Sequence, residues 1–148
     1  VLTSAQRELF IEGICRERPK VASIHRITVS EKIEAKNPYT DFRITPSRSE
    51  SDEVTQVAPD IAVCSECLRD RKMQAHRLQY PFVNCTHCGP RFSIIRDLPY
   101  DRGQTTMSAF SMCPSCQKEY TTVCDRRFHA EPVACNHCGP SYYALFLE

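Results

Sequence analysis

The chain has 148 residues, of which 41% are hydrophobic and 25% are charged, and its formal net charge is +1. This composition is typical of a globular protein with one domain or two small ones. No apolar run approaches the roughly 20 residues that a membrane span needs, so we expect a cytoplasmic protein without membrane contact.

The first predicted element is a helix that begins after Thr3 and ends before Pro19. Gln6 follows Thr3 at the spacing of a capping box, in which each side chain bonds the other residue's backbone amide. Three large apolar side chains form one face of this helix, namely Leu9, Phe10 and Ile14. We expect Cys15, close to that face, to be buried as a small hydrophobic side chain.

Two short strands are predicted after this helix. Residues 21 to 29 are rich in β-branched side chains and roughly alternate, and Phe42 with Ile44 marks the second strand. One helix and two strands bury too little apolar area to form a domain alone. We therefore expect residues 1 to 46 to be the end of a larger domain that begins before Val1, which agrees with the lack of an initiator methionine.

A polar segment separates this part from the rest of the chain. Residues 46 to 59 read PSRSESDEVTQVAP and combine Ser, Asp and Glu with a proline at each end. We assign a linker to residues 47 to 59, a metal-binding region to residues 60 to 140, and the start of a connection to a further domain to residues 141 to 148.

Eight of the ten cysteines form four Cys-x-x-Cys pairs, which fall into two similar copies. We expect these copies to be two fingers, residues 64 to 88 and 113 to 138, with 17 and 18 residues between their pairs. Such a pair brings two thiolates to one metal, and a second pair about 15 to 20 residues later completes a zinc tetrahedron. We therefore predict two structural zinc ions, held by Cys64, Cys67, Cys85, Cys88, Cys113, Cys116, Cys135 and Cys138.

Other uses of these cysteines fit the pattern less well. Disulfide scaffolds belong to secreted chains and are rarely built wholly from Cys-x-x-Cys pairs, and a redox pair normally stands alone. Because each copy is a complete unit, we expect sequential pairing within each finger, with crossed pairing as the alternative. Replacing Cys85 is then expected to release one zinc and to leave metal exchange in the other finger little altered.

The upstream and downstream cysteine pairs are followed by different sequences. The upstream pairs run into helix-compatible sequence, whereas Gly89 and Gly139 follow the downstream pairs and suit a left-handed turn. Between the fingers, residues 91 to 95 are a candidate for a short apolar strand. Six aromatic side chains are spaced to fill the region between the zinc sites: Tyr80, Phe82, Phe92, Phe110, Tyr120 and Phe128.

Four further side chains invite assignment as ligands. His87 and His137 lie inside the downstream pairs, but four cysteines already complete each tetrahedron, so we expect supporting or exposed roles. His129 is expected to pack on the second finger at a helix end. Cys124 lacks a partner at the required spacing and is not assigned as a ligand.

The charge balance argues against a nucleic-acid partner. Residues 61 to 140 contain ten Lys or Arg against seven Asp or Glu. Each four-thiolate zinc site adds about −2, so the loaded region carries about −1. Nucleic-acid binders normally present a basic face, so we do not expect a nucleic-acid partner.

The sequence around the cysteines resembles that of one protein family. YPFVNCTHCGPRFSII at residues 80 to 95, and PYDR to CNHCGP at residues 99 to 140, are similar to the tandem zinc-finger region of the HypF carbamoyltransferases of nickel-iron hydrogenase maturation. Residues 1 to 46 then resemble the end of the family's acylphosphatase-like domain. The expected fold class is α+β, small and zinc-stabilised: the C-terminal part of a ferredoxin-like domain followed by two tandem four-cysteine fingers.

The resemblance implies a multi-step enzyme. In the family, one domain hydrolyses carbamoyl phosphate, a second activates the carbamate with ATP, and a third transfers it to the C-terminal cysteine of a partner protein for cyanide-ligand synthesis. The family's catalytic residues would lie before Val1 or after Glu148, so no catalytic residue is assigned and this chain alone is expected to be inactive. The alternative is a free-standing zinc-ribbon adaptor that binds protein or nucleic acid.

Overall fold

The structure is a computed structural model that describes residues 3 to 30 and 57 to 146. The chain divides into two compact units, Val1–Pro46 and Ser47–Glu148, and each is described by itself. The predicted second strand around Phe42 and most of the predicted linker lie outside the described residues.

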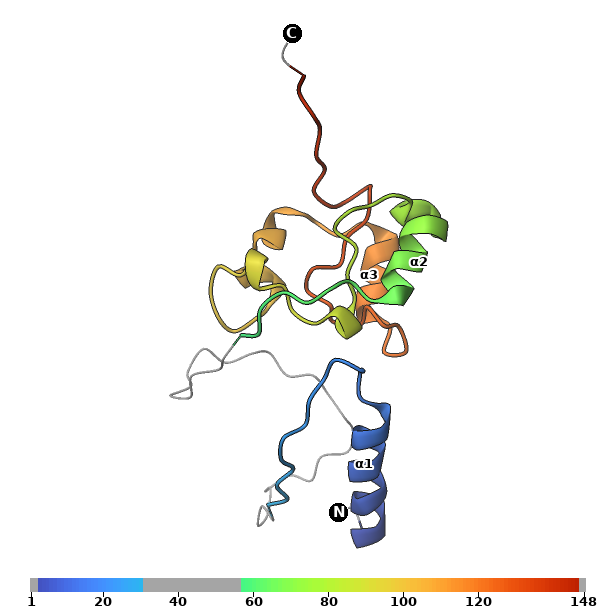
Figure 1. Cartoon of the computed structure of the whole chain (residues 1–148), viewed down its shortest axis with the longest axis vertical. Coiled ribbons are helices and arrows are strands. Elements are labelled where there is room, and N and C mark those ends of the chain that lie inside the picture. Colours follow the sequence, from blue (N-terminus) through green and yellow to red (C-terminus); the bar gives the residue numbers. More distant parts are fainter. Residues whose placement is uncertain (1–2, 31–56, 147–148) are drawn as a thin grey trace. The chain divides into compact units, whose positions relative to one another are not determined.

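The first unit contains helix α1, Ser4–Glu17 (Figure 1). Its predicted capping box is confirmed: the Gln6 N–H donates to Thr3 Oγ1 at 3.2 Å, and the Thr3 N–H donates to Gln6 Oε1 at 2.9 Å. The helix ends before Pro19, as predicted. The prediction that Cys15 is buried is wrong, because no described element covers the apolar face of α1 and none of its residues is buried.

The strand predicted at residues 21 to 29 is also absent from the structure. A strand forms only when its backbone groups find a partner, and no described residue forms a ladder with this segment. The described part of this unit therefore does not confirm the acylphosphatase-like portion of the expected fold.

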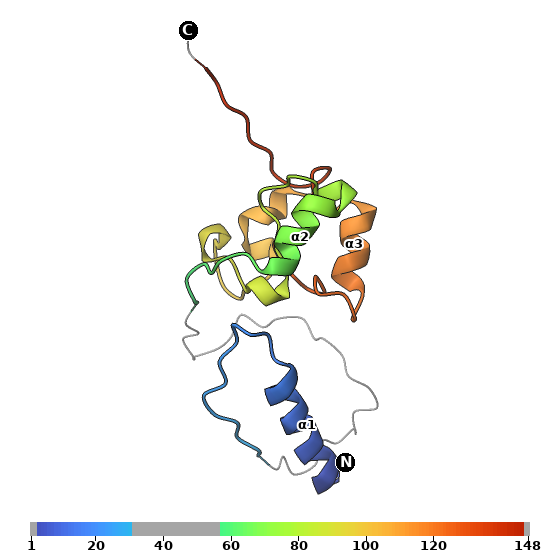
Figure 2. The same cartoon turned by 45° about the vertical axis from the view of Figure 1, so that its right-hand side comes forward.

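The second unit is built from two α-helices and short 3-10 turns. Helix α2 spans Ser65–Met73 and helix α3 spans Pro114–Thr121, and the two lie side by side (Figures 1 and 2). The Gln74 side chain at the end of α2 donates to Glu119 of α3 at 3.3 Å. The 3-10 turns are η1 Ala75–Arg77, η2 Thr86–Cys88, η3 Phe92–Ile94, η4 Arg102–Gln104 and η5 Thr106–Ala109.

Each helix begins directly after the first cysteine of an upstream pair. Cys64 is the N-cap residue of α2 and Cys113 that of α3, and both have extended backbones. Pro114 occupies the first turn of α3, where its fixed φ and missing N–H cost nothing. The second cysteine of each pair therefore lies within the first helical turn, which positions both thiols at the same end of the helix.

The two fingers repeat the same local fold. Six residues before each downstream pair, Gln79 and His129 both have a positive φ, 59° and 50°. The Gln79 N–H donates to the Arg71 carbonyl at 2.8 Å, and the His129 N–H donates to the Tyr120 carbonyl at 3.0 Å. Arg71 and Tyr120 each lie four residues after the second cysteine of an upstream pair, so the equivalence extends through both fingers.

The strand predicted at residues 91 to 95 is wrong. This segment forms the turn η3, and only Ile95 pairs, in an isolated antiparallel bridge with Thr105. The Arg96 and Asp97 N–H groups both donate to the Gln104 carbonyl, at 2.9 and 3.2 Å. A single bridge closes the loop between these residues, but it does not supply the successive paired residues that a β-ladder requires.

Two small hydrophobic clusters enclose the cysteines. Tyr80, Val83, Met107 and Ala134 pack around the first set, and Ala130 and Val133 pack around the second. The predicted aromatic filling is confirmed for Tyr80, which is buried, but Phe82 and Phe92 are 47% and 60% exposed. In the described ranges, no helix is both long enough and apolar enough to cross a bilayer.

Candidate metal centres

The first group of cysteines lies between the N-terminus of α2 and turn η2. The sulfur atoms of Cys64, Cys67, Cys85 and Cys88 all lie within 4.8 Å of one another. The Cys64 and Cys85 sulfurs are 3.6 Å apart, and those of Cys85 and Cys88 are 3.8 Å apart. The Cys64 N–H also donates to the Cys88 sulfur at 3.3 Å, which favours a thiolate there.

The second group repeats this arrangement at the start of α3. The sulfur atoms of Cys113, Cys116, Cys135 and Cys138 again lie within 4.8 Å of one another. Individual sulfur pairs are separated by 3.6 Å (Cys116 and Cys138), 3.7 Å (Cys113 and Cys135) and 3.8 Å (Cys135 and Cys138). The cysteines are therefore grouped sequentially by finger, and not in crossed order.

These separations fit a tetrahedral metal and not a disulfide. Four sulfurs at about 2.3 Å from a zinc ion would lie about 3.8 Å from one another. A disulfide brings two sulfurs to about 2.05 Å, and all ten cysteines are free. The two groups therefore suit two zinc ions, and each donor set is complete without a fifth residue.

Each group contains a thiol that ionises at or below neutral pH. Hydrogen bonds from the thiols of Cys67 and Cys85, together with the Cys64 amide, lower the pKa of Cys88 to about 3. Burial opposes ionisation of Cys113, but hydrogen bonds from the Cys116 amide and from neighbouring thiols bring its pKa to about 7. Thiolates are the form that binds metal, so both sites are prepared for a cation.

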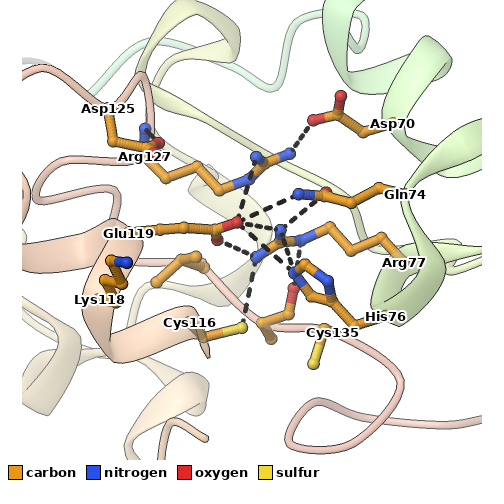
Figure 3. A network of polar contacts seen from close by, with 12 residues as sticks. Asp70, Gln74, His76, Arg77, Cys116, Lys118, Glu119, Asp125, Arg127 and Cys135 are labelled. Atoms are coloured by element: carbon orange, nitrogen blue, oxygen red, sulfur yellow. Dashed lines mark hydrogen bonds and ion pairs between the residues drawn. The ribbon is translucent and has the colours of Figure 1, made fainter. Parts of the chain in front are cut away.

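An arginine of the first finger reaches the second cysteine group. Arg77, at the end of η1, is fully buried, and its Nη2 donates to the Cys116 sulfur at 3.3 Å. The same guanidinium pairs with Glu119 of α3 at 2.5 and 2.7 Å, and its Nε donates to the Ala134 carbonyl at 3.0 Å. Figure 3 shows Arg77 facing Glu119, with Cys116 on one side of the pair.

Two arginines of the second finger reach the first cysteine group in return. Arg126 donates to the Cys67 sulfur at 3.2 Å and pairs with Asp70 of α2. Arg127 lies 2.5 Å from the same carboxylate, and its Nε donates to the Asn84 carbonyl at 3.2 Å. Figure 3 shows Arg127 between Asp70 and Glu119.

Arg77, Glu119 and Arg126 keep their charge in partly or fully buried positions. Burial opposes the charge on Arg77, but the Glu119 carboxylate outweighs it and raises the arginine's pKa. Burial likewise opposes ionisation of Glu119, but the Arg77 guanidinium lowers its pKa. Burial also opposes the charge on Arg126, whereas the Cys67 sulfur, followed by other nearby negative groups, raises its pKa.

Residues outside the two groups have the positions expected of non-ligands. His87 and His137 are exposed, and Cys124 is exposed as well. The His129 ring packs against Tyr120 of α3, with ring centroids 4.7 Å apart, in agreement with its expected packing on the second finger.

The contacts of these arginines and acids with the cysteine groups were not predicted from the sequence. The repeat contains the signal, because Arg77 and Arg127 each lie eight residues before a downstream pair, and Asp70 and Glu119 each lie three residues after an upstream pair.

Comparison with known proteins identifies the family of this arrangement. The family model described as "HypF finger" matches residues 63 to 95 and 112 to 145. Carbamoyltransferase HypF of Rhodobacter capsulatus is 44% identical over 139 residues, which is 94% of this chain. The chain belongs to the HypF family.

Solved HypF structures have the same fold over most of the chain. A crystal structure of full-length HypF, in the phosphate- and nucleotide-bound form, matches 93% of this chain with a TM-score of 0.81 and 49% identity. HypF of T. kodakarensis matches 95% of it with a TM-score of 0.68 and 42% identity. The chain spans only about a fifth of these proteins: 18% of the R. capsulatus relative, and 18% and 17% of the two solved chains.

Proposed function

We propose that the eight clustered cysteines hold two structural zinc ions, one in each HypF finger. The observation that carries this proposal is the pair of complete four-sulfur groups, each with sulfur separations of 3.6 to 3.8 Å. Catalytic zinc keeps an open position for water or substrate, whereas four cysteines close the site. The metal therefore stabilises the fold.

Metal analysis of the full chain tests this assignment. We expect two zinc ions per chain and two freely reactive thiols, Cys15 and Cys124, which are the two exposed cysteines outside the groups. Structural zinc contributes roughly 10 to 16 kcal/mol per site in small fingers, so a chelator should abolish the circular dichroism signal of the second unit. An unchanged spectrum after complete metal removal, or metal-free chains with disulfides, would overturn the proposal.

The larger role that we propose is that of the finger portion of a carbamoyltransferase. The family match supports a protein that uses carbamoyl phosphate and ATP to carbamoylate the C-terminal cysteine of a hydrogenase-maturation partner in the cytoplasm. Residues 1 to 46 would be the acylphosphatase-like part, residues 47 to 59 a linker, and residues 60 to 140 the fingers that join the enzyme's active parts. The chain alone would be inactive.

A chimeric enzyme tests the larger role. The 139 matched residues of R. capsulatus HypF are replaced by the corresponding residues of this chain, and carbamoylation of the partner's cysteine is followed by mass spectrometry. We expect the chimera to be active, the same chimera with Cys113→Ser to be inactive, and this chain alone to transfer nothing. A zinc-loaded but inactive chimera would refute equivalence to the family's finger region.

A further inference from the structure

The two fingers exchange arginines across their shared boundary. Arg77 belongs to the first finger but donates to Cys116 of the second, at 3.3 Å. Arg126 belongs to the second finger but donates to Cys67 of the first, at 3.2 Å. We refer to Arg77 and Arg126 as the cross-finger arginines.

The acids that orient these arginines are exchanged in the same way. Glu119 of the second finger pairs with Arg77 at 2.5 Å, and Asp70 of the first finger pairs with Arg126. Asp70 also accepts from Arg127 at 2.5 Å, and that residue is the counterpart of Arg77 in the repeat. Each cross-finger arginine therefore has its acid and its sulfur on the finger to which it does not belong.

Backbone hydrogen bonds continue the exchange along the boundary. The Thr86 N–H donates to the Arg126 carbonyl at 3.0 Å, and the Asn136 N–H donates to the His76 carbonyl at 3.0 Å. Thr86 and Asn136 directly follow Cys85 and Cys135, so each downstream pair is held by the finger opposite. These contacts make the position of each cysteine group depend on the fold of the other finger.

We propose that the cross-finger arginines couple the two metal sites, so that the loss of metal from one finger weakens the other. A thiolate that accepts a charge-assisted hydrogen bond is stabilised, and four thiolates with one divalent cation leave a buried charge of about −2 for an arginine to offset. Arg77 keeps its position only while the first finger is folded. The second site therefore loses a donor when the first site empties, and the reverse holds through Arg126.

This coupling replaces the expectation of independent sites. With independent fingers, removing Cys85 would leave metal exchange in the second finger unchanged. With the arginine exchange, Cys85→Ser should speed metal loss from both fingers. The inference rests on the proposed zinc assignment and requires two bound zinc ions in the unmodified chain.

Finger-resolved alkylation tests the arginines directly. The zinc-loaded full chain is exposed to iodoacetamide, and the reaction rate of each cysteine is read by peptide mass spectrometry. Arg126, with its side chain 21% exposed, can be changed to Met with little overpacking. Because loss of a group that supports a metal ligand typically costs 10- to 100-fold in affinity, we expect first-finger cysteines to react about 10- to 100-fold faster while second-finger cysteines change less.

Two further variants test whether the change in alkylation rate follows the finger that each arginine contacts. Arg77→Met should produce the opposite pattern, with faster alkylation of the second finger, and Arg126→Lys should restore part of the protection by keeping a charged donor. Arg69→Met is the matched control, because Arg69 is exposed on α2 and donates to no sulfur among the described residues. An equal rise in both fingers, or a rise confined to the substituted residue's own finger, would overturn the proposal.

Native mass spectrometry of partly loaded chains measures the coupling itself. With one equivalent of zinc per metal-free chain, identical independent sites would leave about half of the chains with one zinc. We expect chains with no zinc or two zinc to dominate, and Arg126→Met to increase the one-zinc population. A dominant one-zinc species in the unmodified chain would refute the coupling alone, whereas no zinc binding at all would refute the zinc assignment.

Discussion

The two glycines that follow the downstream cysteine pairs occupy equivalent positions for different physical reasons. Gly89 has φ 71° and ψ 179°, a conformation that is essentially restricted to glycine. A Cβ there would not clash, because its nearest neighbour, Ile61 Cδ1, lies at 3.7 Å, an ordinary van der Waals contact. Gly139 is not among the glycines of positive φ. The expectation that both glycines serve a left-handed turn is therefore wrong for Gly139.

Steric crowding is the reason that position 139 requires glycine. A Cβ there would lie 2.7 Å from Ala134 Cβ and 2.8 Å from Tyr80 Cζ, and it would contact the Tyr80 hydroxyl oxygen. Tyr80 is 1% exposed and packs in the core, so it cannot swing aside into solvent. Overpacking of this kind costs about 1 to 3 kcal/mol, and we expect Gly139→Ala to lower the free energy of unfolding by that amount.

A double-mutant cycle separates the two causes. Tyr80→Phe removes one of the three close contacts, so it should offset part of the cost of Gly139→Ala, with a coupling of at least about 0.5 kcal/mol. Gly89→Ala should cost about 1 to 3 kcal/mol through backbone strain and show no coupling to Tyr80→Phe. Gly103→Ala, where a Cβ meets nothing within 4 Å, is the neutral control.

The assay is guanidinium unfolding followed by circular dichroism, at a fixed excess of free zinc because metal binding adds to the measured stability. Gly139→Ala with the stability of the Gly103→Ala control would refute the steric argument. Equal coupling of Tyr80→Phe to Gly89→Ala and to Gly139→Ala would also refute it, because only a Cβ at position 139 would contact Tyr80.

Three smaller changes test other parts of the structure. Burial raises the pKa of Glu131, so the folded state prefers the protonated acid, and stability falls as the pH rises from the ordinary pKa of about 4.3 through the raised pKa. Glu131→Gln can still accept from Tyr120, so its stability relative to the unmodified chain should increase across that pH window. A stability difference that is independent of pH would contradict this. Thr3→Ala removes the cap that bonds Gln6 and should cost α1 about 0.5 to 2 kcal/mol, measured as lost helical circular dichroism on heating, with Ser at the same position as the control. Cys124→Ser should leave two zinc ions bound and remove one reactive thiol, whereas a lost zinc would show that this exposed cysteine is a ligand.

Local features of the fold were predictable from short stretches of sequence. The capping box at Thr3 and Gln6 depends on residues three apart, and each cysteine pair is brought together by a single turn. The spacing of the copies predicted two groups of four, and the structure brings the same eight sulfur atoms together. The strand predictions at residues 21 to 29 and 91 to 95 failed because a strand depends on a partner that local alternation cannot supply.

The sequence by itself therefore determined the two four-cysteine groups and the family, since thiol identity and spacing are properties of the chain. Only the tertiary structure decided how the fingers depend on each other. Arg77 and Cys116 are 39 residues apart in the chain, and Arg126 and Cys67 are 59 apart, so no local pattern predicts that they meet. They meet because α2 and α3 pack side by side (Figures 1 and 2). In that arrangement an arginine of each finger donates to a sulfur of the other finger.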